Sequence, residues 1–140
     1  MPLAFEKQPP NHPPNFFNSR TIPKMAPAQW CLLKGKTAAI TGGTTGIGRA
    51  IALEFVCQGC NVAVNHLGLQ SDTHHKESLL EEARKIKAEE GNAGELIEIQ
   101  GDVTNPQTGK NLVEEAVRKW GRLDVFVSNA GVCKFAEFLE

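Results

Sequence analysis

Three glycines are the residues of this chain best suited to binding an anion. Gly42, Gly46 and Gly48 follow a strand-like apolar run over residues 37–41, and Ile47 opens a helical apolar pattern. A glycine turn lets the backbone approach a ligand closely, because no Cβ stands in the way. The helix behind it presents free N–H groups and the positive end of its dipole. The stretch therefore predicts a phosphate-binding turn, with an ordinary glycine loop as the alternative.

The spacing of these glycines is G-x-x-x-G-x-G, not the G-x-G-x-x-G of long Rossmann dehydrogenases. Residues 41–48, TGGTTGIG, match the T-G-x-x-x-G-I-G pattern of the short-chain dehydrogenase/reductase family. Asp102-Val103 after a third predicted strand and Asn129-Ala130-Gly131 after a fourth add two further family motifs. The chain therefore resembles this family over residues 33–140. Two short stretches, residues 64–67 and 126–133, resemble more narrowly the fungal sugar 1-dehydrogenases that oxidise L-rhamnose.

The resemblance implies an α/β fold of the Rossmann-like, doubly wound parallel type that binds NADP or NAD. It places the pyrophosphate over the turn from Gly42 to Gly48, where the hydroxyls of Thr44 and Thr45 could donate to the phosphates. An acid at the end of the second strand would accept the ribose 2′-hydroxyl of NAD and repel the 2′-phosphate of NADP. Here that position holds Asn65 and His66, neutral donors with no acid nearby, so NADP is permitted.

Two later motifs are expected to meet the rest of the cofactor. In the family the Asp102 carboxylate would accept from the adenine amine, assisted by the Val103 backbone, although a turn or N-cap aspartate is the alternative. Small residues at Ala130 and Gly131 would let the loop approach the cofactor ribose. The side chain of Asn129 could tie strands together and be mainly structural.

The catalytic residues of the family, a serine and a Tyr-x-x-x-Lys, are not expected here, because the sequence contains no tyrosine. We therefore predict the cofactor-binding half of an NAD(P)-dependent oxidoreductase, truncated before those residues, with a sugar substrate only if completed. The alternative is a non-catalytic dinucleotide-binding module or a partner of a full-length relative. A phosphate-loop nucleotidase is disfavoured because G-x-x-x-x-G-K-[ST] is absent.

Hydrophobic periodicity predicts the elements that would position these residues. The expected strands are residues 37–41, 61–65, 96–100 and 123–128, and the expected helices are 46–58, 73–90 and 106–120. Right-handed crossovers then give an incomplete sheet in the order 3-2-1-4. The pattern predicts that the first helix buries one face, formed by Ile47, Ala50, Ile51 and Phe55.

The last predicted strand would lie at the edge of this sheet. Val125, Phe126 and Val127 form an apolar run with unpaired backbone groups on one side, which is typical of a strand that pairs with other chains. We therefore expect self-association or aggregation.

The remaining sequence bounds the organisation of the chain. Residues 1–30 are rich in proline and show no periodicity, which predicts a disordered extension before a domain over residues 31–140, although Met25 is an alternative start. A net charge of −1 gives no basic footprint for nucleic acid, and no apolar run is long enough to predict a membrane span.

Four cysteines without a secretory signal predict reduced thiols and a cytoplasmic protein. Cys57 and Cys60 form a C-x-x-C, but at the end of a helix rather than at its start, where the dipole would lower a thiol pKa. We expect buried small residues there and no metal site.

Overall fold

Strands and helices alternate along the chain, as the periodicity predicts. The computed structural model describes residues 31–132, so the predicted extension over residues 1–30 and the last residues, 133–140, lie outside the described part. In chain order the elements are β1 (Thr37–Ile40), α1 (Gly46–Cys57), β2 (Asn61–His66), the 3-10 turn η1 (Gln70–Asp72), α2 (Thr73–Glu90), β3 (Leu96–Gln100), α3 (Pro106–Trp120) and β4 (Val125–Val127).

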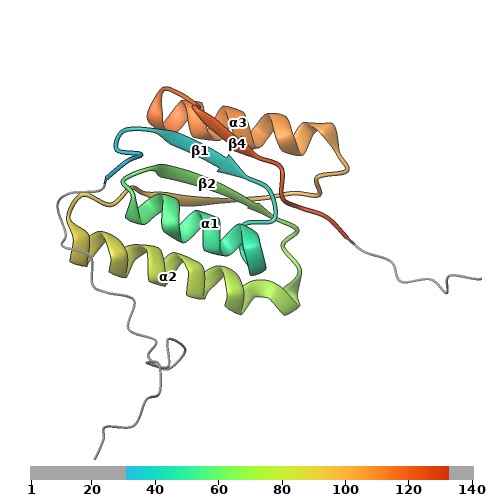
Figure 1. Cartoon of the computed structure of the whole chain (residues 1–140). Helices are drawn as coiled ribbons and strands as arrows, with labels where there is room; N and C mark the ends of the chain where they lie inside the picture. Colours follow the sequence, from blue (N-terminus) through green and yellow to red (C-terminus); the bar gives the residue numbers. More distant parts are fainter. Residues whose placement is uncertain (1–30, 133–140) are drawn as a thin grey trace, which may run out of the picture.

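The four strands form one parallel sheet in the order β3-β2-β1-β4, which confirms the predicted Rossmann-like topology (Figure 1). Strand β1 is central, and its residues alternate between two fully buried layers. Ala38 and Ile40 pack with α1 and α2 on one face, whereas Ala39 packs with α3 on the other. The small side chains of β1 let helices approach from both sides, which is the three-layer arrangement of a doubly wound fold.

The ends of α3 show why the chain starts and stops this helix where it does. The Asn105 side chain accepts a hydrogen bond from the Gln107 N–H at 3.0 Å, and Pro106 occupies the first helical position. Gly121 ends the helix in a left-handed conformation and donates its N–H to the Val117 carbonyl at 2.7 Å. None of the helices between residues 31 and 132 has the length and apolarity that crossing a membrane requires.

The predicted buried face of α1 is partly wrong. The structure buries Gly48, Ala52 and Val56, whereas Ile47 is 75% exposed and Ala50 is also exposed. Ile51 and Phe55 are half-buried and do pack against the core, as expected. The prediction placed the largest apolar side chains on the buried face. The first turn of α1 instead contacts the glycine turn through Gly48, and this contact sets the rotation of the helix.

Strand β4 is shorter than predicted and lies at the edge of the sheet described here. Its valines, Val125 and Val127, pack against the core shared with α1 and α2. Phe126 points to the other face and is 47% exposed, because α3 packs over β1, β2 and β3. An apolar side chain is therefore left partly in water on an edge strand.

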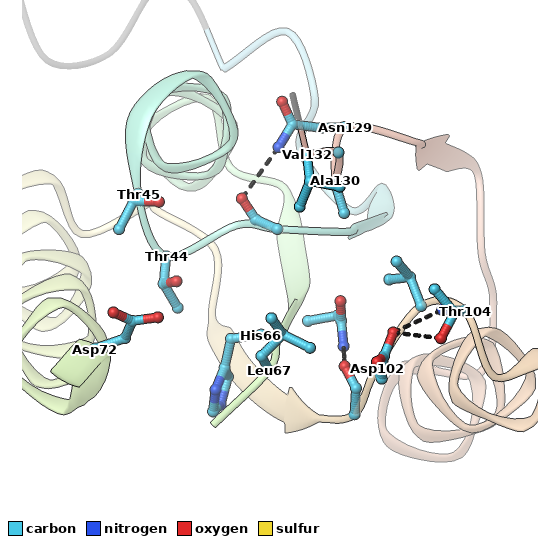
Figure 2. Close-up of a pocket in the computed structure, with 15 residues that line it drawn as sticks. Thr44, Thr45, His66, Leu67, Asp72, Asp102, Thr104, Asn129, Ala130 and Val132 are labelled. Carbon is cyan, nitrogen blue, oxygen red and sulfur yellow. Dashed lines mark hydrogen bonds between the residues drawn. The ribbon is translucent and has the colours of Figure 1, made fainter. Parts of the chain in front are cut away.

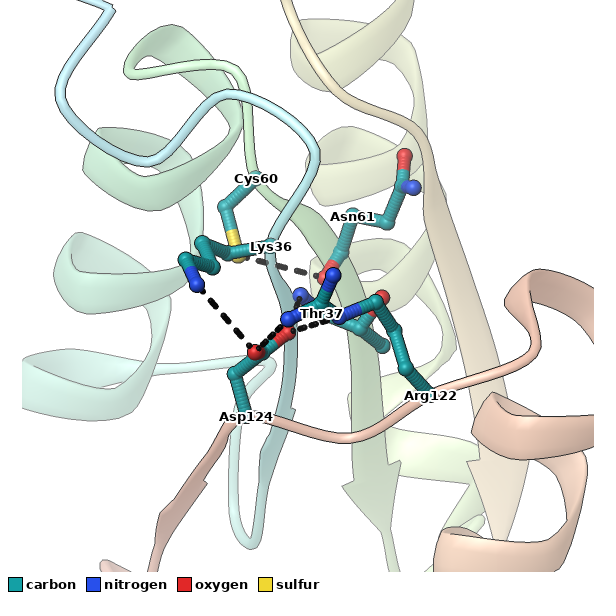
Figure 3. Close-up of polar contacts among 6 residues, drawn as sticks. All are labelled: Lys36, Thr37, Cys60, Asn61, Arg122 and Asp124. Atoms are coloured by element: carbon teal, nitrogen blue, oxygen red, sulfur yellow. Dashed lines mark hydrogen bonds and ion pairs between the residues drawn. The ribbon is translucent and has the colours of Figure 1, made fainter.

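Asp124 joins the start of β4 to the start of β1, at the amino ends of these two strands (Figure 3). Its carboxylate accepts from the Thr37 N–H at 2.9 Å and from Arg122 Nε at 2.8 Å, and Lys36 Nζ lies 3.5 Å away. The hydrogen bond from Arg122, then that from the Thr37 backbone, lowers the pKa of Asp124 to about 2. These contacts fix the position of β4 along β1.

This ionised contact predicts how the stability of the chain depends on pH. The pKa of Asp124 is lower in the folded state than its ordinary value of 3.8, so its stabilisation is complete above about pH 4 and is lost as the pH falls toward 2. Asp124→Asn should lower the free energy of unfolding at pH 7 and flatten its decline between pH 4 and 2. Urea unfolding followed by circular dichroism at several pH values measures both effects. Glu89→Gln, an exposed acid on α2, is the control, and parallel pH profiles for Asp124→Asn and the parent chain would contradict the prediction.

The exposed Phe126 leads to a prediction about association. Phe126→Lys should reduce self-association of the 140-residue chain and cost little stability, because a charge on an edge strand disfavours pairing with another chain. Val127→Lys should instead destabilise the fold, since Val127 packs in the core. Sedimentation velocity over a concentration series measures association. A parent chain that stays monomeric at every concentration would refute the expectation.

Candidate functional site

The loops after the four strands surround one cavity of about 520 Å³ (Figure 2). All four strands are parallel, so their carboxyl ends lie at the same edge of the sheet. In open α/β sheets this edge is where ligands bind.

Most of the residues predicted from the sequence line this cavity. They are Gly42, Thr44, Thr45, Asn65, His66, Asp102, Val103, Asn129, Ala130 and Gly131. The other three predicted residues, Gly46, Ile47 and Gly48, form the first turn of α1 next to it. The structure therefore gathers the three sequence motifs around one cavity.

The glycine turn is shaped by two constraints. Gly42 and Gly46 adopt positive φ angles of 63° and 54°, which other residues rarely adopt. A Cβ on Gly48 would lie 2.3 Å from the Gly42 carbonyl oxygen and 2.5 Å from Asn129 Nδ2, so no larger residue fits there. The N-cap residue of α1, Thr45, makes no side-chain capping bond, which leaves the first N–H groups of this helix suited to an anion.

Asn129 clamps this turn to the end of β4. Its amide Nδ2 donates to the carbonyls of Thr41 and Gly42, each at 3.0 Å. The N–H groups of Asn129 and Ala130 both donate to the Thr41 hydroxyl, also at 3.0 Å. The Asn129 amide group therefore ties the end of β1 and the glycine turn to the loop after β4.

Asn65 and His66 are held by the neighbouring strand β3. Asn65 is 2% exposed, and its Nδ2 donates to the Gly101 carbonyl at 2.8 Å. His66 Nε2 lies 2.5 Å from a Glu98 carboxylate oxygen, and Figure 2 shows its ring turned away from the glycine turn. The two side chains expected to donate to a ribose thus already have partners in the protein.

Asp102 is an ionised acceptor at the mouth of the cavity. Its Oδ1 accepts from the Thr104 N–H and from the Thr104 hydroxyl, both at 2.8 Å, and these bonds lower the pKa of Asp102, the backbone bond most. Its Oδ2 has no hydrogen-bond partner among the residues described. The turn role and the binding role are therefore compatible, since one oxygen shapes the loop and the other can accept from a ligand.

The sequence reasoning missed several residues that line the cavity. These are Leu67, Asp72, Gly101, Thr104 and Val132. Asp72 is the one with a charge, and it comes from the turn η1 just before α2. An aspartate before a helix is ordinarily interpreted as an N-cap, so its sequence position gave no sign of a place in the cavity.

The C-x-x-C pair has the properties expected of unreactive thiols. Cys60 is buried, and burial first and Asp124 second raise its pKa to about 11. Burial, followed by the nearby Glu54 and Glu90, also raises the pKa of Cys57. Neither thiol is poised as a thiolate at neutral pH.

The parallel sheet, the glycine turn and the cavity together define a Rossmann-like α/β protein with a cavity at the carboxyl edge of its sheet. The family described as short chain dehydrogenase matches residues 36–140. The chain belongs to this family, and its fold is that of the oxidoreductases grouped in it.

Several curated relatives share the named substrate L-rhamnose. The L-rhamnose-1-dehydrogenase of Scheffersomyces stipitis is 51% identical over 109 residues, which cover 78% of this chain and 40% of that protein. An L-rhamnose 1-dehydrogenase (NAD(P)(+)) of Sphingomonas is 42% identical over 110 residues, covering 78% and 39%. An L-rhamnose 1-dehydrogenase (NADP(+)) of Thermoplasma acidophilum is 36% identical over 107 residues, covering 75% and 38%. The chain therefore spans about 40% of the length of these relatives.

Solved structures agree with this assignment. A short-chain type dehydrogenase/reductase from Mycobacterium marinum superposes with a TM-score of 0.65 at 29% sequence identity. The match covers 77% of this chain and 40% of that structure.

The contact between Gly48 and the turn predicts a pair of opposite mutational effects. Gly48→Ala should destabilise the chain by roughly 1–3 kcal/mol, because its Cβ meets the Gly42 carbonyl and the Asn129 amide. Gly109→Ala, in the interior of α3 with nothing near its Cβ, should stabilise the chain by up to about 1 kcal/mol. Urea unfolding measures both. Equal effects of the two substitutions would show that the close contact at Gly48 is not a constraint.

Proposed function

We propose that this chain binds a nicotinamide dinucleotide in the cavity at the carboxyl ends of its strands, as the cofactor-binding half of an NAD(P)-dependent oxidoreductase. One observation carries the proposal: the glycine turn before α1 and the carboxylate of Asp102 line the same cavity. A dinucleotide has the matching groups, a pyrophosphate and an adenine amine, at opposite ends of an adenosine.

Each part of the cofactor has protein groups suited to it. The pyrophosphate would lie over the glycine turn, against the first N–H groups of α1 and the hydroxyls of Thr44 and Thr45. The adenine amine would donate to Asp102 Oδ2, beside Val103, which is 43% exposed. The small residues Ala130 and Gly131 would border the ribose on the nicotinamide side. When bound, the nicotinamide accepts or delivers a hydride.

We further propose that the hydride donor is a sugar of the L-rhamnose type, oxidised at C1. The names of the relatives support this substrate, which belongs to the whole enzyme rather than to the residues described here. The family uses a tyrosine as acid or base, and these 140 residues contain none. The cysteines are consistent with work in the cytoplasm, where thiols stay reduced.

The lack of tyrosine also favours a second candidate, a dinucleotide-binding module that does not catalyse. The two candidates share the binding site and differ in what completes it. Adding the catalytic half of a relative as a separate chain distinguishes them, because a cofactor-binding half should restore turnover and an independent module should not.

The proposal predicts binding without turnover. Isothermal titration calorimetry should show that NADH binds to the 140-residue chain. Asp102→Asn should weaken this binding by roughly tenfold, since a charge-assisted acceptor for the adenine amine is lost. Glu114→Gln, an exposed acid on α3, should bind like the parent chain.

Turnover is measured in the same samples. Mixing the chain with L-rhamnose and NAD⁺ should give no NADH absorbance. The sequence has no tyrosine to act as acid or base, and general acid–base catalysis typically raises a reaction rate 10²–10⁴-fold. Failure of the parent chain to bind any dinucleotide would refute the proposed function, and turnover at the rate of a complete relative would refute the expected absence of catalytic residues.

A further inference from the structure

Every formally charged side chain that lines the cavity is acidic. Asp72 and Asp102 lie on it, and within residues 31–132 no lysine or arginine does. The start of α1 can balance a pyrophosphate through its N–H groups and dipole. A further phosphate bound elsewhere in the cavity would have no cation to meet it.

Two cations on the neighbouring helices, Arg49 and Lys76, already contact other groups. Arg49 on α1 donates to the His75 carbonyl at 3.1 Å, to the Ser78 hydroxyl at 3.1 Å and to Glu82 at 2.7 Å, which ties α1 to α2. Lys76 on α2 lies 3.6 Å from Glu98, the same carboxylate that holds His66. Recruiting either cation to a ligand would require breaking an existing contact.

Asp72 lies on the side of the cavity formed by the glycine turn. It stands at the N-cap position of α2, yet its side chain makes no capping bond. Its Oδ1 accepts from the Ser71 hydroxyl at 3.0 Å, and its N–H donates to the Leu69 carbonyl at 2.9 Å. Figure 2 shows the carboxylate extending from the start of α2 toward Thr44 and Thr45. The backbone of η1 thus directs a negative charge toward the predicted phosphate turn.

The position of this carboxylate matters for the adenosine ribose. On the proposed function, the ribose lies between the adenine at Asp102 and the pyrophosphate at the glycine turn. Asp72 lines the cavity at the start of α2 and would face the ribose from there. A 2′-hydroxyl there could donate to Oδ2 of Asp72, which has no partner among the described residues. A 2′-phosphate, with a charge of about −1.5 to −2 at neutral pH, would be repelled.

We propose that Asp72 sets the cofactor preference of this site, by accepting the ribose 2′-hydroxyl of NAD and repelling the 2′-phosphate of NADP. The inference rests on the proposed dinucleotide binding and adds to it a specificity-determining residue. The expectation that no acid lies near the end of β2 is wrong, because Glu98 lies 2.5 Å from His66 and Asp72 lines the same cavity. That expectation considered only residues next to Asn65 and His66 in the sequence, whereas the turn η1 places Asp72 at the cavity.

The test compares two ligands that differ only at the ribose 2′ position. Calorimetry on the full 140-residue chain gives dissociation constants for NADH and NADPH at low salt. The parent chain should bind NADH at least tenfold more tightly. Asp72→Asn should lower this preference by about tenfold, mainly by tightening NADPH. Asp72→Ser, which keeps a side chain able to cap α2, should do the same and covers the case in which the asparagine variant does not fold.

Two further variants separate charge from position. Asp72→Glu keeps the charge and should keep the preference for NADH. Asp102→Asn removes the other carboxylate and should weaken both ligands by a similar factor, leaving their ratio unchanged. NADH binding with the same ratio in the parent chain and in both neutral variants would overturn the role of Asp72 while leaving the proposed function intact. Binding of neither ligand by the parent chain would overturn both.

Discussion

The contact between α1 and the glycine turn is the constraint on which the rest of the site depends. Gly48 touches the Gly42 carbonyl so closely that a single Cβ would separate the helix from the turn. The same carbonyl accepts from the Asn129 amide, which belongs to the loop after β4. The glycine turn, the start of α1 and the sequence-distant loop after β4 therefore meet at one backbone oxygen. This arrangement holds the start of α1 at the cavity, and it also rotates the helix so that Ile47 faces solvent.

The two ends of the parallel sheet differ in how far their polar groups are already satisfied by the protein. At the amino ends of β1 and β4, the Asp124 carboxylate is fully used by Thr37, Arg122 and Lys36, so it stabilises the fold and is closed to ligands. At the carboxyl ends, Asp102 uses one oxygen for its own turn and leaves the other open. The two aspartates thus differ in how many of their carboxylate oxygens the protein already satisfies, and only Asp102 keeps one oxygen available.

Electrostatics at the cavity depends on which charged groups remain available to a ligand. Arg49 and Lys76 are close in sequence to the site motifs, but both are paired with acids on α2 or β3. His66 is paired with Glu98. Because these cations are already paired, Asp72 and Asp102 are the formally charged side chains that line the cavity among the described residues. The sequence indicates one acid at this site, Asp102, and the folded chain adds a second, Asp72.

The sequence by itself determined the elements, their parallel order and the location of the glycine turn, because periodicity, glycine spacing and crossover handedness are local or topological properties. It also placed Asp102 and Asn129 at the same edge, since parallel strands bring their carboxyl ends together. Only the tertiary structure decided that Asn65 and His66 bond to β3, that small residues form the buried face of α1, and that Asp72 reaches the cavity. These outcomes depend on which groups meet across long sequence separations and on whether each polar group is already satisfied there, and neither is encoded in the spacing of residues along the chain.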